Sequence, residues 1–157
     1  MNMIDLEGKK APSFNLLGSD GKNHSIKDYQ GKNIVIYFYP KDNTPGCTKE
    51  SCGFRDLNNA FEDHETIILG VSKDGLDSHN KFINDFNLPF VLLSDPDTEM
   101  MQKYGAWGEK VLYGRTSIGC IRSTVIIDKE GIVIKHWKKV PKADAHPQKV
   151  FEFVQSL

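Results

Sequence analysis

The feature that most constrains this chain is an apolar strand followed closely by a helix, with two cysteines at their junction. Residues 33–39 (NIVIYFY) are β-branched and aromatic, as in a buried strand, and Pro40 ends the run. Residues 42–46 (DNTPG) are turn formers, and a helix is predicted over residues 48–63. The apolar residues that repeat there at helical spacing are Phe54, Leu57 and Phe61.

This arrangement puts Cys47 at or just inside the N-terminus of the predicted helix. The first N–H groups of a helix have no intrahelical partner, and the helix dipole is positive at that end. Both effects favour a thiolate over a thiol, and the thiolate is the nucleophilic form of cysteine. We therefore expect Cys47 to be reactive, although burial as a small apolar side chain is the commoner fate of a cysteine.

The spacing of Cys47 and Cys52 carries a second prediction. In one regular helix, residues five apart have Cα atoms separated by about 8.7 Å, whereas a disulfide needs less than about 7 Å. A bond between the two sulfurs therefore requires the first turns of the helix to unwind. Gly53 lowers the cost of that opening, because glycine is about 1 kcal/mol less favourable than alanine inside a helix.

Residues 40–56 (PKDNTPGCTKESCGFRD) closely resemble the active-site motif of peroxiredoxins of the bacterioferritin-comigratory, or Q, type. Further matching segments, in order along the chain, are GKKAPSFNL, GVSKDGLDSHNKF, LLSDPDTEMMQKYGAWGEK and YGRTSIGCIRSTVIIDKEG. The resemblance implies a thioredoxin-like α/β fold, a central mixed sheet flanked by helices, with an N-terminal extension. It also implies a thiol peroxidase that uses hydroperoxide as substrate and thioredoxin or a similar dithiol as reductant, acts in antioxidant defence and is a monomer.

By resemblance, Cys47 is the peroxidatic cysteine and Cys52 the resolving cysteine. Cys47 would become a sulfenic acid, Cys52 would convert it into an intramolecular disulfide, and thioredoxin would reduce that disulfide. Some peroxiredoxins share this pattern without needing the second residue, so a peroxidase that works with Cys47 alone is a close variant.

Three further residues match the motif of the family. Thr44 would position peroxide and thiolate, with capping of the helix as the alternative role. Arg122 would stabilise thiolate and peroxide, with a structural ion pair as the alternative. Pro40 would shield the thiolate, although ending a strand is sufficient reason for a proline there. The remaining arginines, Arg55 and Arg115, are expected to brace the site or to pair with Glu50 or Asp56.

Composition limits the other classes of function. A length of 157 residues with 39% hydrophobic residues predicts one domain over residues 1–157. A net charge of -1 gives no reason to expect nucleic acid or membrane as a partner. No run approaches the roughly 18 apolar residues of a membrane span, and the N-terminal segment lacks an apolar signal core, which predicts a cytoplasmic protein.

The three cysteines favour thiol chemistry over a secreted disulfide framework. A zinc site is disfavoured because no second pair of ligands stands at matching spacing, and no nucleotide-binding fingerprint is present. We therefore expect neither metal nor cofactor, and a packing role for Cys120. Two other hypotheses remain: a redox sensor that uses the same cysteine pair without meaningful turnover, and, less favoured, a general disulfide oxidoreductase.

The rest of the chain alternates strand-like and helix-like segments, which predicts a mixed sheet covered by helices. The strands are expected at residues 66–71, 90–93, 123–128 and 132–137, the last two joined by a tight turn. Helices are expected at residues 78–86, near 98–104, and from 144 onward. Residues 107–119 are interpreted as a long glycine-punctuated connection.

Overall fold

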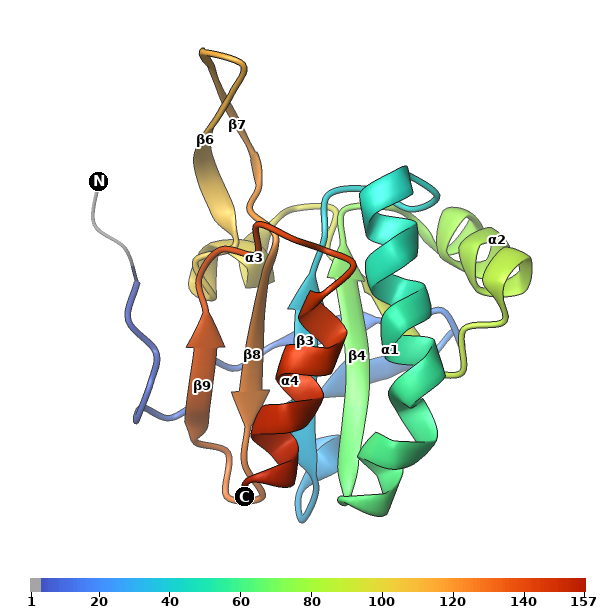
Figure 1. Cartoon of the computed structure of the whole chain (residues 1–157), viewed down its shortest axis with the longest axis vertical. Coiled ribbons are helices and arrows are strands. Elements are labelled where there is room, and N and C mark those ends of the chain that lie inside the picture. The colour runs from blue at the N-terminus through green and yellow to red at the C-terminus, as the bar shows by residue number, and fades with distance from the viewer. Residues whose placement is uncertain (1–3) are drawn as a thin grey trace.

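A five-stranded mixed sheet forms the centre of the computed structural model, which describes residues 4–157 (Figure 1). The strands stand side by side in the order β5-β4-β3-β8-β9. Their bounds are β3 Asn33–Phe38, β4 Thr66–Ser72, β5 Val91–Ser94, β8 Ser123–Ile127 and β9 Val133–Trp137. Strands β3, β4 and β5 are mutually parallel, whereas β8 and β9 run antiparallel to their neighbours. The predicted mixed sheet is therefore confirmed.

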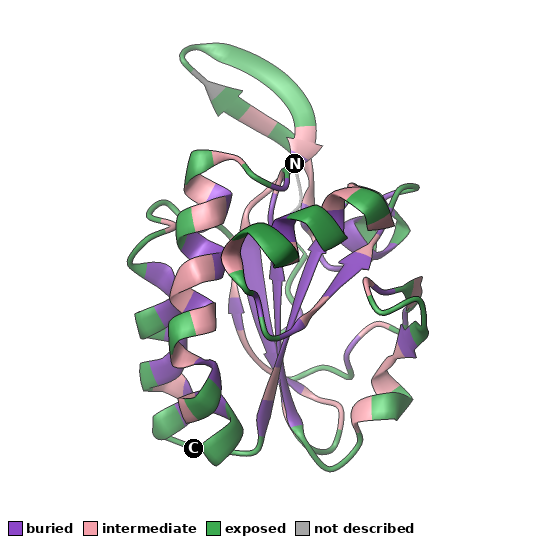
Figure 2. Ribbon diagram, turned by 90° about the vertical axis from the view of Figure 1, so that its right-hand side faces the viewer, coloured by how far each residue is buried: buried purple, intermediate pink, exposed green. Residues whose placement is uncertain are grey.

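Helices cover both faces of this sheet. Helices α1 (Pro45–Asp63), α2 (Leu76–Phe86) and α4 (His146–Gln155) lie on one face, as Figure 1 shows, and the short α3 (Glu99–Lys103) lies on the other. Every residue of β3 is buried, as expected for the central strand of a covered sheet. Figure 2 shows buried strands between helices whose outer faces are exposed.

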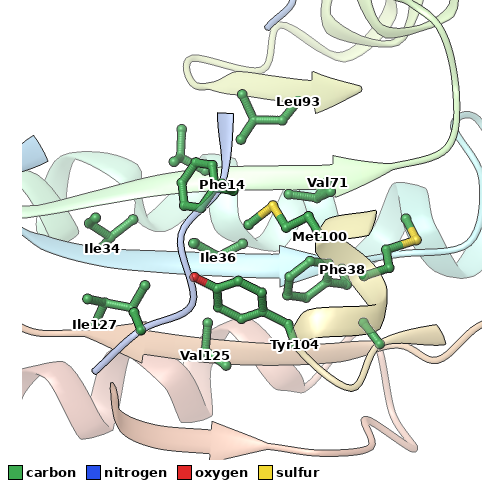
Figure 3. Packing of buried hydrophobic residues seen from close by; sticks show 14 of the residues in the cluster. Phe14, Ile34, Ile36, Phe38, Val71, Leu93, Met100, Tyr104, Val125 and Ile127 are labelled. Atoms are coloured by element: carbon green, nitrogen blue, oxygen red, sulfur yellow. The ribbon is translucent and has the colours of Figure 1, made fainter. Parts of the chain in front are cut away.

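Successive side chains of a strand point to opposite faces of the sheet, and this divides the core into two clusters. Even-numbered residues of β3, such as Ile36, pack with Val125 of β8 and with Tyr104 and Met100 on the α3 face (Figure 3). Odd-numbered residues of β3 pack against α1, α2 and α4. The members of this second cluster that matter for the site are Tyr37, Tyr39, Cys47 and Phe54.

The N-terminal extension forms a small hairpin beside the sheet. Strands β1 (Asn15–Leu17) and β2 (Asn23–Ser25) pair antiparallel, and the 3-10 turn η1 (Ile26–Tyr29) follows them. A bridge between Gly18 and Leu93 joins this unit to the edge strand β5.

One predicted segment is wrong. The presumed connection at residues 107–119 is a hairpin of β6 (Trp107–Leu112) and β7 (Arg115–Cys120), which projects beyond the sheet (Figure 1). Its two-residue turn is Tyr113–Gly114, and both residues have positive φ, 51° and 75°, which the tight turns of hairpins require. The expectation failed because glycines interrupt the segment and the projecting strands bury too little to show regular alternation.

The observed ends of two helices differ slightly from the predicted ones. Helix α1 begins at Pro45 rather than residue 48, because proline is well suited to the first turn of a helix. Helix α2 begins at Leu76, two residues before the predicted start. Within residues 4–157, no helix combines the length and the apolar character that crossing a bilayer demands.

Candidate active site

Cys47 lies in the first turn of α1, at the end of the sheet where β3 runs out into the loop of residues 39–44. We call these six residues the active-site loop. Thr44 holds the N-cap position and Pro45 is the first helical residue, so Cys47 stands third. Its side chain is 1% exposed, and it packs in the cluster that α1, α2 and α4 form with the sheet. The expected place of Cys47, just inside a helix N-terminus, is found.

The structure brings Arg122 to the sulfur of Cys47. Arg122 directly precedes β8, which pairs antiparallel with β3, so the arginine reaches the end of β3 where α1 begins. Its Nη2 donates to Cys47 Sγ at 3.3 Å and its Nη1 donates to Glu50 Oε1 at 2.8 Å. A guanidinium with two forked contacts is held in one orientation, which a lysine ammonium cannot reproduce.

A glycine beside the arginine makes this approach possible. An ideal Cβ on residue 46 would lie 3.2 Å from Nη2 of Arg122, closer than most Cβ contacts. A side chain at that position would therefore displace either the guanidinium or the start of α1. Gly46 thus gives the cation room next to the sulfur.

Glu50 is the partner of Arg122 in the structure. It was one of two carboxylates, with Asp56, considered as partners of Arg55 or Arg115, but it pairs with Arg122, because residue 50 lies about one helical turn beyond Cys47 on the same side of α1. Arg55 contacts Asp56, one of the partners expected for it, and donates to the backbone oxygen of Phe86, whereas Arg115 is exposed in β7. A carboxylate one turn after the cysteine was the available signal for this pairing.

Glu50 is fully buried, and its Oε2 has no hydrogen-bond partner among residues 4–157. Burial raises the pKa of Glu50 to about 7, although the charge and hydrogen bond of Arg122 oppose that shift. The ion pair beneath Cys47 is therefore one whose charge changes near neutral pH. A carboxylate there would offset the guanidinium charge that faces the sulfur, and a protonated carboxyl would not.

Thr44 and Pro40 lie in the active-site loop, and both are partly buried. The Thr44 hydroxyl donates to the backbone oxygen of Lys41 at 2.8 Å and makes no capping bond to α1. Its proton is therefore directed into the loop, and its lone pairs are left to accept. Pro40 follows the buried Tyr39 directly after β3.

Cys52 lies within the same continuous helix and is partly buried. Cys47, Cys52 and Cys120 are all free thiols. Helix α1 is unbroken from Pro45 to Asp63, so Cys47 and Cys52 cannot form a disulfide while the helix is regular. Oxidation to a disulfide would therefore have to change the conformation of α1.

Three contacts hold the first half of α1 in place. The hydroxyl groups of Tyr37 in β3 and Ser51 in α1 are 2.8 Å apart and buried, and the Tyr37 ring stacks on Phe54 at 4.7 Å. Gly53 faces Pro147 at the start of α4, where an ideal Cβ on residue 53 would lie 2.7 Å from Cγ of the proline. Gly53 thus allows the two helices to approach closely, a reason that the sequence alone did not reveal.

Cys120 ends β7, two residues before Arg122, and it is buried. Burial raises the pKa of Cys120 to about 12, which keeps this sulfur a neutral thiol. The environment suits the packing role expected for it. Among the described residues, no group of histidine, cysteine and carboxylate side chains has the arrangement of a metal site.

Most of this chain matches a known protein family. The family model described as AhpC/TSA family matches residues 7–136. The chain is 46% identical over 137 residues to peroxiredoxin Bcp of Bacillus subtilis, covering 87% of each protein. It is 44% identical over 143 residues to a putative peroxiredoxin Bcp of Coxiella burnetii, covering 91% of this chain and 94% of that protein.

Among solved structures, the bacterioferritin comigratory protein of Xanthomonas campestris superposes with a TM-score of 0.85. It is 36% identical to this chain, and the match covers 91% of this chain and 90% of that one. That structure was solved to explain the alkyl peroxide reduction activity of the Xanthomonas protein. A Xylella fastidiosa PrxQ variant superposes with a TM-score of 0.87 at 32% identity, over 99% of this chain and 96% of that one.

Proposed function

This chain belongs to the AhpC/TSA family as a peroxiredoxin of the Bcp group, and from that membership we propose that it reduces both hydrogen peroxide and organic hydroperoxides through Cys47. Peroxiredoxins are thiol peroxidases, and the thioredoxin-like fold expected from the sequence is the fold of its structural relatives. The alkyl peroxide reduction activity of the Xanthomonas relative supports organic hydroperoxides as substrates here.

The observation that carries the proposal is the contact between Arg122 and Cys47. An N–H of the Arg122 guanidinium donates to the Cys47 sulfur at 3.3 Å, so a positive charge lies beside the proposed nucleophile at a helix N-terminus. The N–H groups of Gly46 and Cys47 precede the first intrahelical bond, which Thr48 donates to Thr44 at 2.8 Å. The site therefore combines a cysteine sulfur, a guanidinium donor and backbone N–H groups that precede the first intrahelical bond.

The first step transfers an oxygen atom to sulfur. The Cys47 thiolate attacks the terminal oxygen of ROOH, the O–O bond breaks, and its electron pair leaves with RO⁻. Cys47 becomes a sulfenic acid, and RO⁻ takes a proton from water to become an alcohol, or water when R is hydrogen. Arg122 and the helix N-terminus stabilise the charge that develops on the oxygens. The lone pairs of Thr44 Oγ1 accept a hydrogen bond from the peroxide, because its own proton is donated to Lys41.

The second step uses Cys52. Its thiolate attacks the Cys47 sulfenic acid, the S–O bond breaks, and hydroxide leaves as a disulfide forms. A thioredoxin-type dithiol then reduces the disulfide and is itself oxidised. Because both cysteines belong to one chain, turnover needs no second subunit, and we propose a monomer that works as one domain. We also propose a cytoplasmic location, because three cysteines in 157 residues suit thiol chemistry in a reducing compartment.

The test is a thioredoxin-coupled peroxidase assay on the wild type, Cys47→Ser and Cys52→Ser, with intact mass measured after one pulse of peroxide. We expect turnover in the wild type and none in Cys47→Ser. In Cys52→Ser, sulfenic or sulfinic acid should replace the disulfide. Full turnover in Cys47→Ser would overturn the proposal, and full turnover in Cys52→Ser would remove Cys52 from it. Slow stoichiometric oxidation of the wild type would instead indicate a redox sensor.

A further inference from the structure

A buried polar cluster centred on Asp42 joins the active-site loop to α2. Its carboxylate accepts from the Tyr39 hydroxyl through Oδ1 and from the Ser78 hydroxyl through Oδ2, the latter at 2.8 Å. His79 Nδ1 lies 2.7 Å from the same Oδ2. The side chains of Asp42 and His79 are 1% and 0% exposed. None of these contacts involves Cys47 or Arg122.

The other ring nitrogen of His79 shows how protons are arranged in this pair. His79 Nε2 lies 2.9 Å from the backbone oxygen of Leu93, and a carbonyl oxygen only accepts, so Nε2 carries a hydrogen. One further proton joins Nδ1 to the Asp42 carboxylate. Neither ring nitrogen of His79 is then left without a hydrogen-bond partner. This satisfies a polar cluster that would otherwise be costly to bury.

A second contact fixes the backbone of the loop at the same residue. The Asp42 N–H donates to Asp74 Oδ2 at 2.8 Å, and the Ser72 hydroxyl donates to that oxygen as well. The backbone oxygen of Asp74 in turn accepts from the Ser94 hydroxyl at 2.7 Å. The loop is therefore attached to β4, to the β4–α2 connection, to α2 and to β5.

This attachment reaches Thr44 through one peptide unit. The N–H of Asp42 and the backbone oxygen of Lys41 belong to the same planar peptide. The N–H is held by Asp74, and the oxygen accepts the Thr44 hydroxyl proton at 2.8 Å. The orientation of this peptide therefore decides where the Thr44 lone pairs point.

We infer that Asp42 and His79 are positioning residues for peroxide reduction: they hold the Lys41–Asp42 peptide so that the Thr44 oxygen is presented to the substrate beside Cys47. The inference deepens the proposed function and rests on it. It predicts that disturbing the pair impairs reaction with peroxide, which uses Thr44, far more than reactions that need only the thiolate.

The test compares two rate constants in Asp42→Asn and His79→Gln. One is the oxidation of Cys47 by hydrogen peroxide in a single turnover, and the other is the alkylation of Cys47 by iodoacetamide, followed by peptide mass spectrometry. We expect the oxidation rate to fall about ten- to a hundredfold, since small misplacements of positioning groups cost that much. Alkylation should change less than about threefold. The double variant should lose no more than the worse single variant, because both act through one pair.

The control is Asp85→Asn, which removes an exposed carboxylate paired with Lys81 on the same helix as His79. It should leave both rates unchanged. If a core variant fails to fold, Asp74→Ala removes the acceptor of the Asp42 N–H from outside the buried pair and should show the same separation of rates. Thermal unfolding of each variant establishes that it is folded.

Three results would overturn the inference. Unchanged peroxide rates in the folded variants would show that the pair does not position Thr44, and equal losses in both reactions would show a general effect on the thiolate. A wild type that does not react with peroxide would overturn the proposed function and this inference together. In contrast, a reactive wild type with equally reactive variants would contradict the inference alone.

Discussion

Gly53 in α1 and Pro147 in α4 approach so closely that an ideal Cβ on residue 53 would lie 2.7 Å from Cγ of the proline. The contact stands next to Cys52, in the part of α1 that must open for a disulfide to form. Gly53 therefore serves two purposes, since it weakens the helix and admits α4. These two roles predict opposite effects on protein stability when a methyl group is added at residue 53.

Gly53→Ala should destabilise the protein. Alanine would improve helix propensity by about 1 kcal/mol, but overpacking against Pro147 costs about 1–3 kcal/mol. We expect the free energy of unfolding to fall by about 1 kcal/mol, measured in urea. Adding Pro147→Ala should restore the loss, because it removes the ring atom that the new methyl meets. A more stable Gly53→Ala single variant would show that the close contact does not limit the helix.

Oxidation should loosen α1 locally. Because residues five apart in a helix cannot form a disulfide, the Cys47–Cys52 bond requires the first turns to unwind. Hydrogen exchange followed by mass spectrometry should show faster exchange over residues 45–56 in the disulfide form than in the reduced form. The parallel strand β4 should exchange equally in both. Peroxide-treated Cys52→Ser, which cannot form the bond, should keep the reduced pattern, and an equally protected disulfide form would contradict the predicted opening.

Arg122→Lys should lower the rate of Cys47 oxidation by about ten- to a hundredfold. Lysine keeps the charge but loses the forked contact to Glu50 and to the sulfur, which orients the cation. Arg122→Met should lower both oxidation and iodoacetamide alkylation, since it removes the positive charge beside the sulfur. This joint loss distinguishes the arginine from the Asp42–His79 pair. Arg115→Lys, an exposed arginine of β7, is the control and should leave both rates unchanged.

Glu50 should make stability depend on pH in an unusual direction. Burial raises the pKa of Glu50 from 4.5 to about 7, so over this range the folded chain binds more protons at this residue than the unfolded chain does. The contribution of Glu50 to the free energy of unfolding is therefore fully present below pH 4.5. It is lost as the pH rises through about 7, and the total loss is about 3 kcal/mol.

The measurement is the difference in free energy of unfolding between the wild type and Glu50→Gln at pH 5 and pH 8. The wild type should lose stability relative to the variant between these values. The difference is needed because buried His146, whose pKa is lowered to about 4, acts in the opposite direction below its ordinary value of 6.5. Glu152→Gln, an exposed carboxyl of α4, should show no such change. A pH-independent difference for Glu50→Gln would contradict the raised pKa.

Residues close together in the chain could be interpreted correctly from the sequence. The strand before Pro40, the helix that carries Cys47 and its incompatibility with a disulfide follow from side-chain periodicity and helix geometry, which are local properties. The β6–β7 hairpin was missed because its stability depends on a two-residue turn with positive φ rather than on a buried face.

The partners of the site were decided by tertiary structure. Arg122 was expected near Cys47 from family resemblance, and it reaches the sulfur because β8 pairs antiparallel with β3. The same packing selected Glu50 as the partner of Arg122, Pro147 as the neighbour of Gly53, and His79 as the partner of Asp42. Periodicity encodes which face of an element is buried, but not which distant residue meets it there. The sequence alone therefore predicted the nucleophile and the obstacle to its disulfide, whereas sheet register and helix packing determined which groups surround Cys47.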